Sequence, residues 1–120
     1  MSDYKDEIID HYKNPRNFGE MESPDLTMTE ANSSCGDLIK ISLKMDGDRI
    51  QEMKWQGVGC AISTASASML SEKVKGMSGE DLEKMGESGV TAMLGGEVNP
   101  GRMKCATLAL RGLQKMLKNE

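Results

Sequence analysis

The sequence predicts an α+β domain in two layers, a three-stranded antiparallel sheet with helices packed on one of its faces. The clearest strand signal is the strict alternation of apolar and polar residues over 39–45. A short polar turn at 46–48 leads directly into a second apolar segment, as in a hairpin. The third observation is helical, because apolar residues over 106–117 recur at spacings of three and four.

The first expected element is a short helix over residues 3–12. Tyr4, Ile8 and Tyr12 lie at spacings of four and would share one face. Pro15 ends this helix, because proline disfavours helical geometry at the residue before it.

Three strands are expected next. A short alternating segment at 26–29 predicts the first, and the alternating segment at 39–45 predicts the second. The return strand runs from about 50 to 56. Its apolar residues change from an even-numbered position at the start to odd-numbered positions further along, so the alternation is broken once. A β-bulge near Gln51 would account for that break.

The rest of the chain is expected to be helical, with a glycine-rich middle. One helix runs from about Cys60 to Lys75 and is closed by Gly76. The segment 76–98 holds one short helix, Gly79 to Met85, and the last helix starts between Asn99 and Lys104 and runs to about Lys118. The core-facing positions of the two long helices are Ile62, Ser66, Met69, Leu70 and Val74, then Ala106, Ala109, Leu110, Leu113, Met116 and Leu117.

Length, charge and composition limit the number of domains, the partners and the location to be expected. A chain of 120 residues is expected to form one domain, 1–120. Its net charge of −4 and its lack of basic clusters argue against nucleic acid or an anionic membrane as the main partner. No apolar segment approaches the ~20 residues that span a bilayer. The charged start, MSDYKDEIID, lacks the apolar core of a signal peptide, so a cytoplasmic location is expected.

The three cysteines stand near the ends of expected elements. Cys35 lies in the loop before the clean strand and shares one side of an extended chain with Asp37. Cys60 begins a helix, where backbone N–H groups and the helix dipole favour a thiolate, so a depressed pKa is expected. Cys105 lies in or near the first turn of the last helix, beside Lys104.

If these element ends converge, three thiolates and one carboxylate form a four-ligand site for zinc or an iron–sulfur cluster. The same pattern fits three unrelated buried thiols, because free cysteine packs as a small hydrophobic residue. Asp37 also fits a simple turn residue. The single histidine, His11, is expected at the surface or at a helix end and not as a ligand.

Four motifs carry a resemblance that runs through the whole chain. They are HYKNPRNFG (11–19), SSCGD (33–37), WQGVGCAISTASAS (55–68) and RMKCATLAL (102–110). In this order, and near these spacings, they resemble the IscU/NifU N-terminal type of iron–sulfur cluster assembly scaffold. The resemblance implies the α+β fold of that family and a cluster site made by the three cysteines and the aspartate of C-G-D. Carried over to this chain, the metal and cluster ligands are Cys35, Asp37, Cys60 and Cys105.

The resemblance implies a scaffold and not an enzyme, although sulfurtransferase activity fits the same thiolates. A cysteine desulfurase would supply sulfur as a persulfide, iron would enter, and a [2Fe–2S] cluster would be built and passed to apo iron–sulfur proteins. Thiolates serve here both as nucleophiles and as soft iron ligands. A homo-oligomer such as a dimer would shield a cluster at the end of the domain.

Two departures from the family pattern bear on its partners. Lys104 stands where IscU of the bacterial ISC system has a histidine, and a protonated lysine offers no lone pair to a metal. The L-P-P-V-K motif read by a dedicated Hsp70 chaperone corresponds here to VNPGR at 98–102, so that partnership is not carried over.

The ending R-x-K-C resembles SufU, although the segment between Cys60 and Cys105 is too short for the insertion of SufU chains. This gives a second interpretation, a zinc-dependent sulfurtransferase in which zinc holds the same four side chains, and zinc is also an alternative occupant of a cluster-free scaffold. A purely structural zinc module ranks third, because such sites use closely spaced Cys and His pairs.

Overall fold

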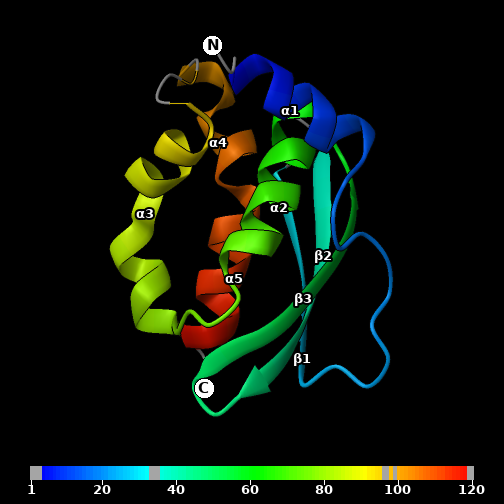
Figure 1. The fold of residues 1–120 in the computed structure, drawn as a ribbon, viewed down its shortest axis with the longest axis vertical. Coiled ribbons are helices and arrows are strands. Elements are labelled where there is room, and N and C mark those ends of the chain that lie inside the picture. The colour runs from blue at the N-terminus through cyan, green and yellow to red at the C-terminus, as the bar shows by residue number, and fades with distance from the viewer. Residues whose placement is uncertain (1–3, 33–35, 96–97, 99, 119–120) are drawn as a thin grey trace.

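The computed structural model describes residues 4–32, 36–95, 98 and 100–118. Its elements follow the chain as one helix, three strands and then helices (Figure 1). They are α1 Tyr4–Lys13, β1 Leu26–Asn32, β2 Asp37–Asp46, β3 Arg49–Val58, α2 Ala61–Lys73, α3 Gly79–Met93, the 3-10 turn η1 Pro100–Arg102, α4 Met103–Ala106 and α5 Leu108–Lys118.

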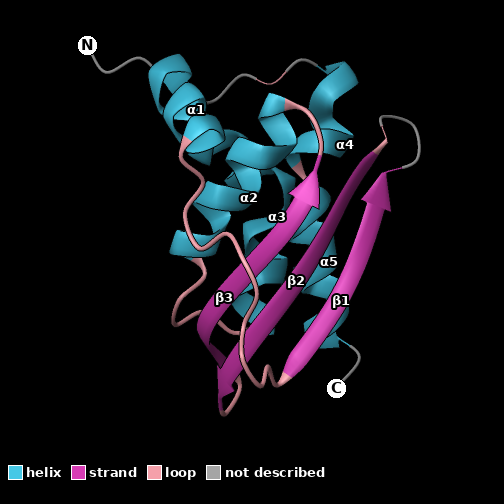
Figure 2. Cartoon of the chain, turned by 90° about the vertical axis from the view of Figure 1, so that its right-hand side faces the viewer, coloured by secondary structure: helices cyan, strands magenta, loops and turns pink. Residues whose placement is uncertain are grey.

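The predicted fold class is confirmed, because the three strands form one antiparallel sheet in the order β1-β2-β3 with the helices behind it (Figure 2). The alternation over 39–45 turns Ile39, Ile41 and Leu43 into the core, where all three are buried. The predicted bulge is also present. Lys44 pairs with Glu52 and Met45 with Ile50, which leaves Gln51 as the extra residue between them.

Residues 17–19 close the edge of β3 that the other strands leave free. The backbone N–H of Gly19 donates to the carbonyl of Trp55 at 2.8 Å, and the N–H of Trp55 donates to the carbonyl of Asn17 at 3.1 Å. The indole N–H of Trp55 donates to the Arg16 carbonyl at 2.9 Å. The ring of Phe18 meets that indole edge-on, with centroids 4.9 Å apart. Much of the motif at 11–19 therefore attaches the N-terminal segment to the sheet.

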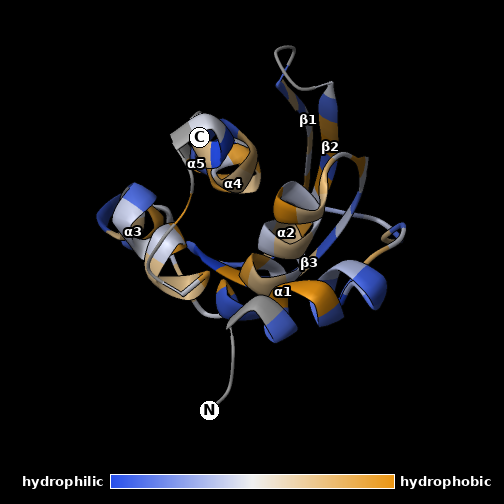
Figure 3. Ribbon diagram, turned by 90° about the horizontal axis from the view of Figure 1, so that it is seen from above, coloured by the Kyte–Doolittle hydropathy of each residue, from blue (hydrophilic) through white to orange (hydrophobic). Residues whose placement is uncertain are grey.

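Helices α2 and α5 cover the inner face of the sheet, while α1 packs on α2 and α3 packs on α5 (Figure 3). More residues of α2 are buried than the core-facing positions predicted from the sequence. Its serines and alanines from 65 to 68 are all buried, because the helix has neighbours on several sides. Small side chains let these neighbours approach closely. Within the described ranges, no helix is both long and apolar enough to cross a membrane.

The face predicted for the first helix is partly wrong. Ile8 packs toward the core, but Tyr12 is 47% exposed and His11 turns inward instead. The Ser68 hydroxyl oxygen on α2 accepts the N–H of Arg16 at 2.8 Å and also forms a hydrogen bond with Nδ1 of His11 at 2.7 Å. Burial and the nearby Arg16 charge lower the pKa of His11, consistent with a neutral ring. His11 is at a helix end, as expected, but is mostly buried.

The two later helices also differ from their predictions. Helix α3 does not stop at Met85; Gly86 adopts φ 56° and ψ −166°, and the helix resumes beyond this kink because Val90 and Leu94 are buried in the core. The last helix is not continuous. It breaks at Thr107, whose hydroxyl donates to the Met103 carbonyl at 2.8 Å, so α4 is a single turn before α5.

Candidate metal centre

Three of the four ligands predicted from the sequence meet at one end of the molecule. Asp37 begins β2, Cys60 precedes α2 as its N-cap residue, and Cys105 lies in α4. The carboxylate oxygen and the two sulfur atoms all lie within 4.8 Å of one another. This is the end where β3 finishes and α2 begins, at the top of Figure 1. The convergence of element ends that the sequence suggested is therefore present for these three residues.

Asp37 is 2% exposed and is only half satisfied. Its Oδ1 accepts the backbone N–H of Cys60 at 3.2 Å. Its Oδ2 is buried and finds no hydrogen-bond partner among the described residues. An unpartnered buried carboxylate oxygen is costly, and a bound metal ion would satisfy it. The turn-residue interpretation of Asp37 does not explain this buried oxygen.

Cys60 is half-buried and is surrounded by donors. Burial alone would raise the pKa of its thiol, but the backbone N–H and hydroxyl of Ser63, the Cys105 thiol and the backbone N–H of Ile62 outweigh it and lower that pKa. The Ser63 oxygen lies 3.8 Å from the sulfur and also donates to the Cys60 carbonyl at 3.1 Å. A hydroxyl rotates freely, so it can turn to a thiolate when one forms. The expected pKa depression is present.

Alkylation should report this lowered pKa. In the metal-free protein, the rate of Cys60 modification by iodoacetamide should reach half its maximum at a lower pH than it does after unfolding in urea, because the lowered pKa keeps the thiolate present to lower pH. Ser63→Ala should shift the midpoint upward, and Thr64→Ala, which changes the next residue, should not. Peptide-resolved mass spectrometry separates Cys60 from the other thiols. Equal midpoints in Ser63→Ala and the parent would refute the role given to that hydroxyl.

Cys105 is fully buried, and Asn32 reaches it from the end of β1. The side-chain nitrogen of Asn32 lies 3.9 Å from the Cys105 sulfur, and the amide itself is buried. Neither Asn32 nor Ser63 was predicted as part of the site. Ser63 carried a signal, since it lies three residues after the N-cap residue, where capping partners are found. Asn32 carried none.

Gly59 leaves the room in which two of these side chains meet. A Cβ atom there would lie 2.3 Å from the Ser63 hydroxyl and 2.7 Å from Oδ1 of Asp37. Any larger residue would therefore push the carboxylate away from the sulfur atoms. The glycine before Cys60 has a direct steric function in the site.

Two predictions at this end of the molecule stay open. Cys35 lies outside the described residues, so its part as a fourth ligand remains a prediction. Lys104 is exposed on α4, and its carbonyl accepts a hydrogen bond from Arg111 at 2.9 Å. We expect the positive charge of the Lys104 side chain to offset part of the negative charge of a loaded site, and this too remains a prediction.

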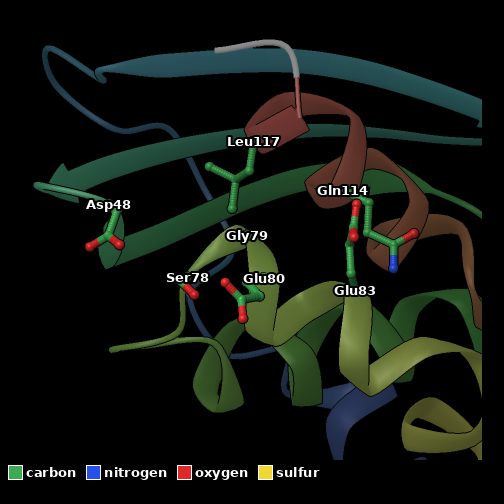
Figure 4. Close-up of a pocket in the computed structure, with 7 residues that line it drawn as sticks. All are labelled: Asp48, Ser78, Gly79, Glu80, Glu83, Gln114 and Leu117. Carbon is green, nitrogen blue, oxygen red and sulfur yellow. The ribbon is translucent and has the colours of Figure 1, made fainter.

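A hollow of about 410 Å³ lies at the opposite end of the molecule (Figure 4). It sits between the β2–β3 turn and helices α3 and α5. Its lining consists of Asp48, Ser78, Gly79, Glu80, Glu83, Gln114 and Leu117. These residues include carboxylates but no thiol or imidazole, so the chemistry of soft metals belongs to the other end.

The model of the NifU-like N-terminal domain matches residues 3–119 of this chain. The chain belongs to this family. This NifU-like domain is 36% identical to the zinc-dependent sulfurtransferase SufU of Bacillus subtilis (strain 168), over 98% of this chain and 90% of that protein. It is 38% identical to the iron–sulfur cluster assembly scaffold protein IscU 1 of Archaeoglobus fulgidus, over 95% of this chain and 74% of that protein.

Solved structures agree with this assignment. A crystal structure of a hypothetical protein matches the NifU-like domain with a TM-score of 0.84 and 31% identity, over 96% of both chains. A SUF-system scaffold protein for iron–sulfur cluster assembly from Fervidobacterium islandicum matches with a TM-score of 0.79 and 28% identity, over 98% of this chain and 96% of that one. The chain is thus a member of the IscU/SufU group of iron–sulfur cluster assembly scaffolds, with a candidate metal site at one end.

Proposed function

We propose that this protein is a scaffold on which a [2Fe–2S] cluster is assembled, from sulfur supplied by a cysteine desulfurase and from iron, and then passed to apo iron–sulfur proteins. The observation that carries the proposal is the cluster of two thiols and one half-satisfied carboxylate within 4.8 Å. Two soft sulfur donors and one carboxylate suit iron in a cluster or zinc, and they do not suit magnesium or calcium. Cys35 completes the proposed ligand set of Cys35, Asp37, Cys60 and Cys105.

Cys60 is suited to receive sulfur. Its thiol is partly exposed and has a lowered pKa, whereas Cys105 is fully buried. A thiolate at Cys60 would attack the outer sulfur of the donor's persulfide, forming a new S–S bond, while the donor's cysteine leaves as a thiolate. The apolar side chains of Leu38 and Val58, paired across β2 and β3, are exposed beside this site and offer a docking surface to donor and acceptor proteins.

Asp37 would be the ligand that lets the cluster leave. A carboxylate is a harder and weaker partner for iron than a thiolate, and it holds a buried negative charge beside the cluster sulfides. Asp37→Ala is therefore expected to lengthen the lifetime of the bound cluster and to slow its delivery. The measurements are the decay of the cluster absorption and the rate of transfer to an apo-ferredoxin. Asp48→Ala, at the opposite end, is the control; a parent-like transfer rate in Asp37→Ala would mean that Asp37 does not govern release.

A zinc-dependent sulfurtransferase is the second candidate. The observation that favours it is Lys104 beside Cys105, in the R-x-K-C pattern that resembles SufU, together with 36% identity to the Bacillus subtilis protein of that name. In this case zinc would stay bound and Cys60 or another cysteine would leave it to accept sulfur. A dimer that shields the site stays a prediction under either function.

The two candidates separate in one experiment. The protein is purified without oxygen, and iron, acid-labile sulfide and zinc are measured per chain before and after incubation with a cysteine desulfurase, cysteine, ferrous iron and a thiol reductant that converts persulfide sulfur to sulfide. A scaffold should gain iron and sulfide in equal amounts and transfer both to an apo-ferredoxin. Tightly held zinc, with no sulfide gained but with sulfur passed on to a second acceptor, would replace the first candidate by the second.

A further inference from the structure

We infer that Asn32 is a positioning residue of the metal centre, whose side-chain amide donates an N–H···S hydrogen bond to the Cys105 thiolate when a metal is bound. Asn32 is not one of the proposed ligands and belongs to none of the four motifs. The inference rests on the metal centre of the proposed function and deepens it. It applies equally to a cluster and to zinc, because both need Cys105 as a thiolate.

Backbone pairing fixes the position of Asn32. It is the last residue of β1 and pairs with Asp37, the first residue of β2. Residues paired across two strands have side chains on the same face of the sheet. The Asn32 amide and the Asp37 carboxylate therefore point together toward the helices, and both are buried. A metal ion bound to Asp37 would lie next to this amide.

The contact of Asn32 with Cys105 joins residues 73 positions apart in the sequence. The donor nitrogen lies 3.9 Å from the sulfur, at the long end for a hydrogen bond to this large acceptor. Cys105 is fully buried, so water does not solvate a thiolate there from outside. A thiolate accepts hydrogen bonds and cannot donate them, so the amide N–H is the end of Asn32 that suits a metal-bound Cys105.

The chemical consequence follows from how hydrogen bonds act on thiolates. An N–H···S bond stabilises the sulfur lone pairs and reduces the charge that the sulfur donates to the metal. Hydrogen bonds to sulfur are among the features that set the reduction potentials of iron–sulfur clusters. Partners of metal ligands commonly change metal affinity by about 10–100-fold. Because the bond stabilises and positions the thiolate that the metal needs, Asn32 should strengthen metal binding. Because it lowers the charge that the sulfur donates, it should also raise the reduction potential of a bound cluster.

Cobalt(II) gives a direct spectroscopic test, because its thiolate charge-transfer band reports the energy of the sulfur lone pairs. Asn32→Leu keeps a similar size and removes the donor, so the band should move to lower energy and zinc affinity, measured by chelator competition, should fall about 10–100-fold. Asn32→Asp replaces the N–H by an anionic oxygen, so it also removes the donor and should move the band to lower energy. Thr29→Leu, on the opposite face of β1, is the matched control and should leave band and affinity unchanged.

The outcomes distinguish this role from a purely structural one. Urea unfolding of each metal-free variant checks that the fold survives, and a band that shifts in a folded Asn32→Leu protein supports the hydrogen bond. An unshifted band with parental zinc affinity would overturn the inference. Failure of the parent to assemble an iron–sulfur cluster would defeat the proposed scaffold function while leaving the cobalt test intact.

Discussion

Gly57→Ala is expected to lower the free energy of unfolding of the metal-free protein by about 3 kcal/mol. A Cβ atom at Gly57 would lie 2.3 Å from the backbone carbonyl oxygen of Leu38 on the neighbouring strand. Paired backbone cannot give way as a side-chain end can, so this end of the β2–β3 ladder must separate. Urea unfolding under reducing conditions measures the loss. Val58→Ala, at the exposed next position, should change stability by less than about 0.5 kcal/mol.

Gly59→Ala, two residues later, should weaken metal binding more than it lowers the stability of the fold. At Gly59 the added carbon meets only the ends of the Ser63 and Asp37 side chains, which can move. We expect a loss of stability below about 1 kcal/mol but at least a 10-fold loss of zinc affinity, because the carboxylate is displaced. Chelator competition and urea unfolding on both variants provide the comparison. Equal effects of the two alanines on folding would show that the steric assignment is wrong.

Cys105→Ser is expected to lower zinc affinity by more than about 100-fold, since even changes to residues behind a ligand cost 10–100-fold. A serine hydroxyl is protonated at neutral pH and is a poor ligand for a soft metal. In a reconstituted protein the sulfur-to-iron absorption should be lost or strongly altered. The measurements are zinc affinity by chelator competition and the visible spectrum after reconstitution.

Thr107→Ser is the control for Cys105→Ser, because it changes a buried neighbour while keeping its hydroxyl. It should bind zinc as the parent does. Unfolding of metal-free Cys105→Ser should show a cost near 1 kcal/mol for the buried polar group, which separates folding from binding. A Cys105→Ser protein with parental zinc affinity would remove this residue from the centre.

The local sequence pattern was enough to predict the sheet and the place of the thiols along the chain's elements. The alternation from Ile39 to Met45 predicts a strand because a strand with one buried face places every second side chain in the core. The break in alternation near Gln51 predicted the bulge without any tertiary information. Cys60 was placed at a helix start because glycines end the strand before it and small residues follow it. The backbone N–H groups of that helix start lower its pKa, and the Ser63 hydroxyl and the Cys105 thiol, which the pattern does not reveal, lower it further.

Tertiary contacts decided what the pattern missed. The spacing predicts a buried Tyr12, but His11 faces α2 and bonds to Ser68 while Tyr12 is exposed. Gly86 looked like a helix end, yet the buried Val90 holds the helix that follows it. The contact between Asn32 and Cys105 depends on two elements far apart in sequence. No periodicity of either segment records such a contact.

Attachment of the N-terminal segment to β3 gives this chain its own optical reporter. Trp55 is the single tryptophan, and its buried indole donates to the Arg16 carbonyl while the ring of Phe18 lies against it. Lifting residues 16–19 away would hydrate the indole and shift its fluorescence to longer wavelength. The same event would expose the hydrogen-bonding groups along that edge of β3 to another extended chain. The fluorescence of Trp55 therefore shows whether residues 16–19 cover this edge of β3 or leave it free to pair with another strand.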